Sequence, residues 1–209
     1  MEGAKAFCIS LDEKALAAFD LFLRELLKWN EKINLTAIRT EKGIIIKHFL
    51  DSLSVFPHLT KNFSLLDIGS GAGFPGIPLK IVEPSFEITL IDSVLKKVDF
   101  QRHIIRRLGL RGIEASHGRV EDKQVLERLE GRFDIVLSRA FSDLQTLLRV
   151  SYPLLKKRGF VLAMKGKVSG EEIYTILEKG SLRYQFQKTV TFPLPSTSFK
   201  RTILLFEKQ

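Results

Sequence analysis

Residues 65–81, LLDIGSGAGFPGIPLKI, constrain the fold more than any other stretch of the sequence. A short apolar run ends at Asp67, and three glycines follow at alternate positions: Gly69, Gly71 and Gly73. Glycine adopts positive φ angles and lets the backbone approach a ligand more closely than a residue with a Cβ atom allows. The stretch therefore predicts a strand, a ligand-binding turn and a helix. Such a turn can hold a dinucleotide, a nucleoside triphosphate or the adenosyl group of a methyl donor.

The chain after residue 63 alternates between strand-like and helix-like segments, which predicts a parallel sheet covered on both faces. We expect strands near 63–68, 87–91, 112–117, 133–138 and 158–165. We expect helices near 75–82, 94–108, 121–130, 142–156 and 169–179. The tail differs, because RYQFQKTVTF and KRTILLFEK both read as strands and the loop between them is too short for a crossover helix. These two strands are expected to pair antiparallel.

Seven strands that end in an antiparallel hairpin are the layout of the Rossmann-like S-adenosylmethionine-dependent methyltransferase fold, which belongs to the α/β class. Residues 1–60 read as an N-terminal helical extension, and 61–209 read as the core of the same single domain, 1–209. In the extension, apolar residues recur at helical spacing over 10–29, and Ser10 with Glu13 forms a candidate capping box. A second helix is expected in KGIIIKHFLDSLSVF, ending near Pro57.

Charge and cysteine content limit the functions open to the chain. The formal net charge is +9, and the excess lies in two segments, 94–111 and 150–209. Basic segments of this kind favour a polyanionic partner such as nucleic acid. The single cysteine, Cys8, excludes an internal disulfide and a cysteine zinc cluster, and we expect no bound metal. The sequence starts without a signal peptide and has no membrane-length apolar run, so we expect a cytoplasmic protein with no membrane partner.

Acidic residues follow three successive strands of the predicted sheet. Asp67 ends the first strand, Asp92 ends the second, and Glu121 with Asp122 follows the third. Ligands of open α/β sheets bind across these carboxyl ends, where Asp92 can accept hydrogen bonds from ribose hydroxyls and Val120 can pack on an adenine ring. Such an acidic site repels a pyrophosphate and accepts a sulfonium. The same carboxylates can also serve only as helix caps or favour the start of a helix.

Six motifs together carry a resemblance to a known family: NLTAI, HFLDSL, LLDIGSGAGFPGIPLKI, LIDSVLKKVDFQR, GRVED and DIVLSRAFSDL. They resemble the bacterial small-subunit (16S) ribosomal RNA guanine-N7 methyltransferase family, formerly called glucose-inhibited division protein B. The likeness covers roughly residues 15–209. It implies transfer of a methyl group from S-adenosylmethionine to N7 of one guanine of 16S ribosomal RNA in the 30S subunit, at position 527 in the usual numbering.

The resemblance also implies roles for individual residues. Gly69 and Phe74 would contact the donor, Asp92 and Ser93 would face its ribose, Val120 and Glu121 its adenine, and Arg139 would stand at the methyl-transfer centre. Val120 replaces a residue that is often alanine in the family.

Seven basic residues are candidate phosphate contacts: Lys96, Lys97, Arg102, Arg106, Lys165, Lys200 and Arg201.

Several alternatives stay open at this point. Arg139 can form a salt bridge to Asp67 or Glu121, and His48 can either line the donor pocket or pair with Asp51 three residues on. Asn34 can cap a helix or contribute to function. Guanine N7 carries a lone pair and no proton, so the implied reaction needs no general base.

The competing functions are an RNA-binding protein with an inactive methyltransferase fold and an NAD-dependent oxidoreductase. Gly71, Gly73 and Gly76 satisfy the dinucleotide pattern, but the match starts four residues after the strand instead of directly after it. We expect a monomer.

Overall fold

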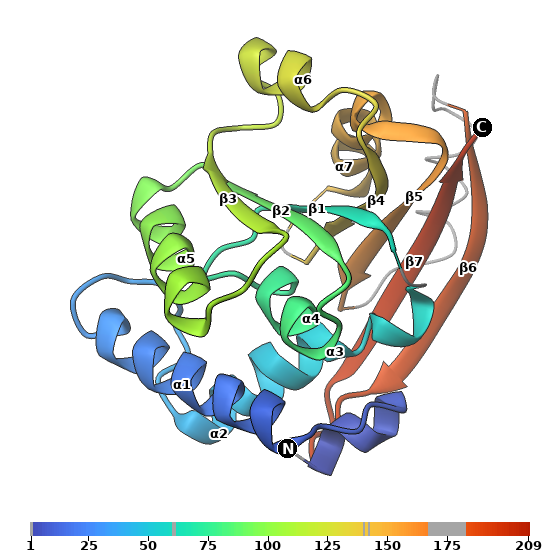
Figure 1. Ribbon diagram of the computed structural model, residues 1–209. Helices are drawn as coiled ribbons and strands as arrows, with labels where there is room; N and C mark the ends of the chain where they lie inside the picture. Colours follow the sequence, from blue (N-terminus) through green and yellow to red (C-terminus); the bar gives the residue numbers. More distant parts are fainter. Residues whose placement is uncertain (1, 60–61, 140, 142, 167–182) are drawn as a thin grey trace.

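The computed structural model describes residues 2–59, 62–139, 141, 143–166 and 183–209. Seven strands form one sheet in the order β3-β2-β1-β4-β5-β7-β6 (Figure 1). Their bounds are β1 Ser64–Ile68, β2 Glu87–Asp92, β3 Ile113–His117, β4 Phe133–Ser138, β5 Leu155–Lys165, β6 Tyr184–Pro193 and β7 Lys200–Lys208. Strands β1 to β5 run parallel, whereas β7 pairs antiparallel with both β5 and β6. The predicted seven-stranded layout with a C-terminal hairpin is confirmed.

Helices cover both faces of the sheet. Their bounds are α1 Glu13–Asn30, α2 Glu41–Ile44, α3 Asp51–Leu53, α4 Gly76–Val82, α5 Leu95–Leu108, α6 Lys123–Leu129 and α7 Leu144–Ser151. One apolar cluster joins α1, α4 and α5 to one face of the sheet, and a second joins α6 and α7 to the other (Figure 1). Alternate residues of β1 supply the two clusters, since Leu65 belongs to the first and Leu66 to the second. The central strand β1 is therefore buried on both faces, as strands inside a parallel sheet are, whereas the edge strands β3 and β6 contain only half-buried and exposed residues.

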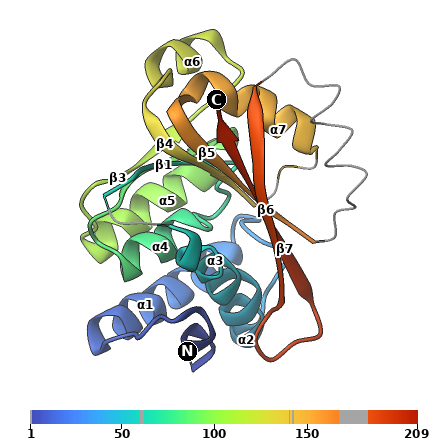
Figure 2. The ribbon, with the colours of Figure 1, turned by 90° about the vertical axis from the view of Figure 1, so that its right-hand side faces the viewer.

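The second N-terminal helical segment runs continuously from α2 through a π-helical turn, Ile45–Leu50, into α3. Thr40 begins it by accepting a hydrogen bond from the Gly43 N–H. The wider π turn replaces the i→i+4 pattern with i→i+5 bonds and changes which side chains share a face; such turns occur frequently at functional sites. Figure 2 shows this segment beside the loop of the β6–β7 hairpin. The N-terminal helices therefore reach the end of the sheet at which the parallel strands have their carboxyl ends.

Several predicted boundaries were wrong. Helix α1 begins at Glu13 with Asp12 as its N-cap, because Asp12 Oδ1 accepts the Ala15 N–H at 2.7 Å, so Ser10 does not form the capping box. The predicted helix over 142–156 is shorter, since α7 ends at Ser151 and a 3₁₀ turn, Tyr152–Leu154, leads directly into β5. Strand β5 thus starts at Leu155, before the expected residue 158. The helix predicted over 169–179 lies outside the described residues.

Candidate functional site

A pocket of about 190 Å³ lies at the carboxyl ends of β1, β2 and β3, and we call it the strand-end pocket. Its lining consists of Ile68, Gly69, Ile91, Asp92, Ser93, Gly118, Arg119, Val120, Glu121 and Phe141. Five of the predicted donor-binding residues are therefore brought together here: Gly69, Asp92, Ser93, Val120 and Glu121. They come from three separate strand ends, which the parallel topology places at one edge of the sheet.

The glycine loop between β1 and α4 has the backbone shape that the sequence predicted. Gly69, Gly71 and Gly73 have φ angles of 69°, 60° and 95°, in a region that favours glycine. A Cβ atom on Gly73 would also collide with the side chain of Ile77, so a larger residue there would have to displace Ile77. Helix α5 secures the loop from behind: the buried Gln101 donates from Nε2 to Ser70 Oγ at 2.8 Å and to the Gly71 carbonyl at 2.6 Å.

Asp92 ties this loop to the start of α5. Its Oδ2 accepts the Gly71 N–H at 2.8 Å, and its Oδ1 accepts the Val94 N–H at 2.9 Å. Each carboxylate oxygen has a second lone pair, so two acceptor positions are left for a ligand in the strand-end pocket. Asp92 thus combines the structural role of holding two loops with the capacity to bind hydroxyl groups.

Asp67 lies beneath the glycine loop and does not line the pocket. It is fully buried, its Oδ2 accepts the Gly76 N–H at 2.9 Å, and its Oδ1 has no hydrogen-bond partner among the described residues. Burial raises the pKa of Asp67 from its usual 3.8 to about 7, against the opposing effects of the Gly76 N–H and the Arg139 charge. Asp122 is also outside the lining, because its Oδ2 accepts the Arg119 N–H, 3.2 Å away, at the start of α6.

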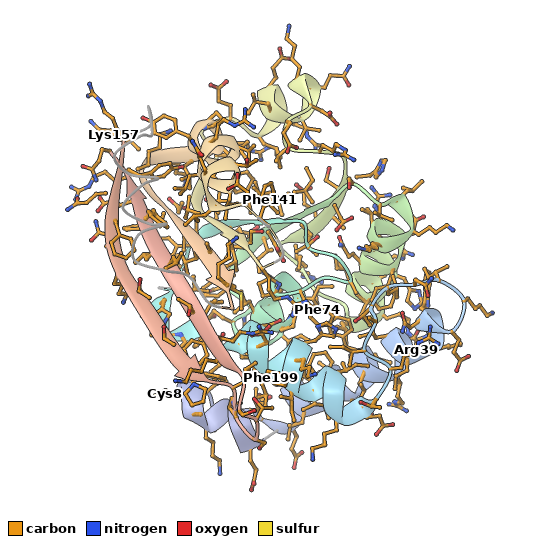
Figure 3. The ribbon with its side chains drawn as sticks, turned by 180° about the vertical axis from the view of Figure 1, so that it is seen from behind. Cys8, Arg39, Phe74, Phe141, Lys157 and Phe199 are labelled. Atoms are coloured by element: carbon orange, nitrogen blue, oxygen red, sulfur yellow. The ribbon has the colours of Figure 1, made fainter. Side chains whose placement is uncertain are left out.

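A second pocket of about 390 Å³ adjoins the first, and we call it the basic pocket. It is lined by Ile38, Lys47, His48, Asp51, Arg139, Phe141, Met164, Lys165, Gly166 and Arg201. The π turn and the residue that follows it supply Lys47, His48 and Asp51. Phe141 lines both pockets and therefore forms a wall between them. Its side chain is labelled in Figure 3.

Arg139 is held in the basic pocket by an acidic partner that the sequence did not indicate. One guanidinium nitrogen, Nη1, lies 3.6 Å from Asp51 Oδ2 and donates to the Lys47 carbonyl at 3.3 Å. The guanidinium also lies 5.2 Å from the centroid of the Phe74 ring. The expected alternatives, salt bridges to Asp67 or Glu121, are wrong. Arg139 is thereby fixed on three sides, with its remaining donors available to the pocket.

Asp51 also binds Arg201. Its Oδ1 accepts from Arg201 Nε at 2.8 Å, and its Oδ2 accepts from Arg201 Nη2 at 3.4 Å. Asp51 is only 1% exposed, and burial raises its pKa while the two guanidinium groups lower it. The carboxylate therefore acts as a shared anchor for two arginines, one from the end of β4 and one from β7. Arg201, predicted as a phosphate contact, is partly committed to this pair.

His48 does not pair with Asp51, which corrects one of the two sequence hypotheses. Its Nε2 hydrogen-bonds to Thr36 Oγ1 at 2.7 Å, and its ring stacks on Phe74 with 4.6 Å between centroids. Burial, with help from the Arg139 charge, lowers the pKa of His48 to about 3, so the ring is neutral at physiological pH. Phe74 is 2% exposed, and its ring contacts both the His48 ring and the Arg139 guanidinium (Figure 3). Its side chain therefore packs beneath these two residues of the basic pocket.

Comparisons with known proteins identify the family. A model described as "GidB: rRNA small subunit methyltransferase G" matches residues 15–200. The chain is 42% identical over 212 residues to the ribosomal RNA small subunit methyltransferase G of Geobacter metallireducens, covering 100% of this chain and 94% of that protein. It is 38% identical over 209 residues to the protein of that name from Acetivibrio thermocellus, covering 100% and 86%. The chain belongs to the rRNA small subunit methyltransferase G family.

Solved structures agree on the fold. A SAM-dependent methyltransferase from Aquifex aeolicus superposes with a TM-score of 0.59 at 16% identity, covering 80% of this chain and 93% of that one. The precorrin-6y C5,15-methyltransferase of Geobacter metallireducens gives a TM-score of 0.53 at 15% identity, covering 84% and 91%. The predicted methyltransferase fold and the resemblance to the GidB family are both confirmed.

The predicted phosphate contacts fall into two groups in this member of the GidB family. Lys165 and Arg201 line the basic pocket, and Lys200 is exposed beside Arg201. The others lie on α5: Lys96, Lys97, Arg102 and Arg106. Lys96 and Lys97 are in the first turn of α5, next to the strand-end pocket, whereas Arg102 donates to the Ala115 carbonyl. Five of the seven cations therefore lie beside the two pockets, and Arg102 and Arg106 lie farther along α5.

Sequence reasoning missed Phe141, Lys47 and Gln101. Phe141 lies in the quoted motif DIVLSRAFSDL, two residues after Arg139, which was the available signal. Gln101 likewise lies in the quoted motif LIDSVLKKVDFQR, whereas Lys47 carried no signal, because it is one polar residue among many on a helix. Within the described residues, no group of three or more His, Cys, Asp or Glu side chains could hold a metal ion. Nor does any helix in those ranges combine the length and apolar character needed to span a membrane.

Proposed function

We propose that this protein transfers a methyl group from S-adenosylmethionine to N7 of one guanine in the 16S ribosomal RNA of the 30S subunit, expected at position 527. The observation that carries the proposal is the pair of pockets that share Phe141 as a wall. The strand-end pocket suits the adenosyl part of the donor. The basic pocket suits a nucleotide of an RNA strand, and a reacting pair of atoms can meet where the two pockets join.

The strand-end pocket has the chemistry to bind the donor. Asp92 retains two lone pairs for the ribose hydroxyls, with Ser93 beside it, and the buried Val120 offers an apolar surface to the adenine beside Glu121. Glycines at 69, 71 and 73 keep side chains out of the turn over which the donor would lie.

The proposed reaction asks the protein for positioning more than for proton transfer. S-adenosylmethionine supplies an electrophilic methyl group: the N7 lone pair forms the new N–C bond, and the electrons of the broken C–S bond stay on sulfur. No proton leaves N7, so no base is required. The neutral His48 and the anchored Arg139 then serve to hold the guanine and its phosphate, and orientation of this kind can supply effective molarities on the order of 10⁵ M.

Binding of the surrounding RNA is proposed for the cations beside the two pockets, which are half-buried at Lys97, Lys165 and Arg201 and exposed at Lys96 and Lys200. Lys165, Lys200 and Arg201 surround the basic pocket, and Lys96 and Lys97 lie by the strand-end pocket. Arg102 and Arg106 would extend the contact along α5. Phosphate contacts of this type make affinity fall steeply with salt. We propose that the protein acts as a monomer in the cytoplasm, with no metal ion.

The test is to incubate the protein with labelled S-adenosylmethionine and 30S subunits that lack this methylation, and then to identify the modified base. We expect one 7-methylguanine and no label in subunits that already carry it. Thermal shift with S-adenosylhomocysteine and with NAD separates the donor assignment from the oxidoreductase alternative. Tight binding to 30S subunits without transfer would instead favour an inactive RNA-binding protein.

A further inference from the structure

Phe199 is exposed in a way that the proposed chemistry does not use. It is 52% exposed and, within the described residues, is the only aromatic ring among the exposed large apolar side chains. It lies in the loop between β6 and β7, which is held by its own hydrogen bonds: the Leu194 N–H donates to the Phe199 carbonyl at 2.8 Å, and the Phe199 N–H donates to Thr197 Oγ1 at 3.1 Å. These bonds hold the backbone of the loop at Phe199, and its ring is open to water.

The surroundings of Phe199 are cationic. Lys47 Nζ lies 4.8 Å from the centroid of its ring, and Lys47 itself lines the basic pocket. Lys200 is exposed next to Phe199, and Arg201 lines the same pocket. The sequence from 193 to 201 contains no acidic residue. Because Lys47 of the π turn lies over the ring and lines the basic pocket, Phe199 lies at the rim of that pocket. Figure 3 shows its side chain beside this helical segment.

An isolated exposed apolar residue needs no explanation. An aromatic ring bordered by cations at the rim of a nucleotide-sized pocket is the arrangement used to bind single-stranded nucleic acid, in which bases stack on rings and cations contact the backbone. The cores of protein–protein interfaces are depleted in lysine, whereas Lys47 and Lys200 border this ring. The positive charge around Phe199 therefore favours RNA as the occupant.

We infer that Phe199 is a stacking platform for an unpaired base of the RNA strand next to the target guanine. This inference rests on the proposed function, because a guanine that enters the basic pocket leaves its stack and its strand neighbour loses a stacking partner. Lys47 covers one face of the ring, and the other face takes the base. Lys47 then lies between the ring and the pocket, where it can contact the intervening phosphate.

The experiment compares four substitutions: Phe199→Ala, Phe199→Leu, Phe199→Tyr and, as a matched control, Leu16→Ala. Leu16 is 41% exposed on α1 and lies outside both pockets, so its removal deletes similar apolar surface elsewhere. Dissociation constants are measured by filter binding with unmethylated 30S subunits and with protein-free 16S RNA, and donor affinity is measured by calorimetry with S-adenosylhomocysteine. Thermal melting of each variant confirms folding.

Removing the ring should weaken binding to both RNA samples about tenfold, within the range measured for one base–aromatic stack. Phe199→Leu should behave like Phe199→Ala, Phe199→Tyr should stay within about twofold of the unsubstituted protein, and donor affinity should not change. Unchanged binding of Phe199→Ala, or rescue by Leu, would overturn the inference. A loss confined to 30S subunits would also overturn it and would indicate a ribosomal protein as the partner.

These readouts separate the inference from the proposed function. Ring-dependent binding without any methyl transfer would refute the proposed function and leave the stacking platform standing. If Phe199→Ala instead methylates guanine N7 with unchanged RNA affinity and rate, the proposed function stands and the stacking platform is refuted.

Discussion

Replacement of Asp67 by Asn should change how the stability of the protein depends on pH. Asp67 is fully buried, and burial raises its pKa from 3.8 to about 7. A carboxyl group with a raised pKa in the folded state contributes stability that is fully present below its unfolded pKa and is lost as pH rises through the folded value. The unsubstituted protein should therefore lose stability between about pH 4 and pH 8 from this group alone.

The magnitude follows from the two pKa values. A pKa shift from 3.8 to about 7 lowers the free energy of unfolding by about 4 kcal/mol at alkaline pH. About 2 kcal/mol of this loss occurs between about pH 5.5 and pH 8.5. An Asn side chain keeps an oxygen for the Gly76 N–H but does not ionise. Asp67→Asn should then gain about 2 kcal/mol relative to the unsubstituted protein over that pH range, whatever constant offset the substitution introduces.

Urea unfolding of both proteins at several pH values provides the measurement. The difference between the two free energies of unfolding cancels the titration of all other groups, so its slope reports Asp67 alone. A difference that stays constant within about 0.5 kcal/mol across this range would refute the claim that Asp67 is a buried carboxyl group with a raised pKa.

Four further substitutions test the site. Asp92→Ala should weaken S-adenosylhomocysteine binding at least about tenfold in calorimetry, because it removes the acceptors for the ribose and one anchor of the glycine loop. Arg139→Ala should lower the single-turnover rate of methyl transfer to 30S subunits about 100-fold, and an equal rate would remove Arg139 from the mechanism. Asp51→Asn should lower the free energy of unfolding by about 2–3 kcal/mol, less than for a fully buried pair because Arg139 and Arg201 are partly exposed. Lys97→Met should reduce the slope of log affinity for 30S subunits against log salt by about one, and an unchanged slope would exclude a phosphate contact.

The strand ends were predictable because they depend on local pattern. β4 begins and ends where its apolar run does, at Phe133 and Ser138, and the glycine loop follows β1 directly. Once strands alternate with helices, the parallel topology places Asp92 and Glu121 at one edge of the sheet without further information. The hairpin was predictable for a related reason, since seven residues between two strands cannot carry a crossover helix.

The basic pocket was not predictable in the same way. Asp51 meets Arg139 and Arg201 across the fold, from positions 88 and 150 residues apart in the sequence, and no local spacing encodes these contacts. The expected pairing of His48 with Asp51 assumed an α-helix, whereas a π turn precedes Asp51 and His48 binds Thr36 instead. The start of α1 shows a smaller failure: Ser and Asp are both favoured N-cap residues, and the structure uses Asp12 instead of Ser10.

The most direct test of the account is to locate the methyl group. After reaction with unmethylated 30S subunits, reduction with borohydride and treatment with aniline cleave an RNA strand at 7-methylguanine, and primer extension finds the position. The account predicts one new cleavage site, at a guanine of the 16S RNA, that requires S-adenosylmethionine and forms far more slowly with Arg139→Ala than with the unsubstituted protein. Label on an exocyclic amine, on a ribose or at several unrelated guanines would contradict it.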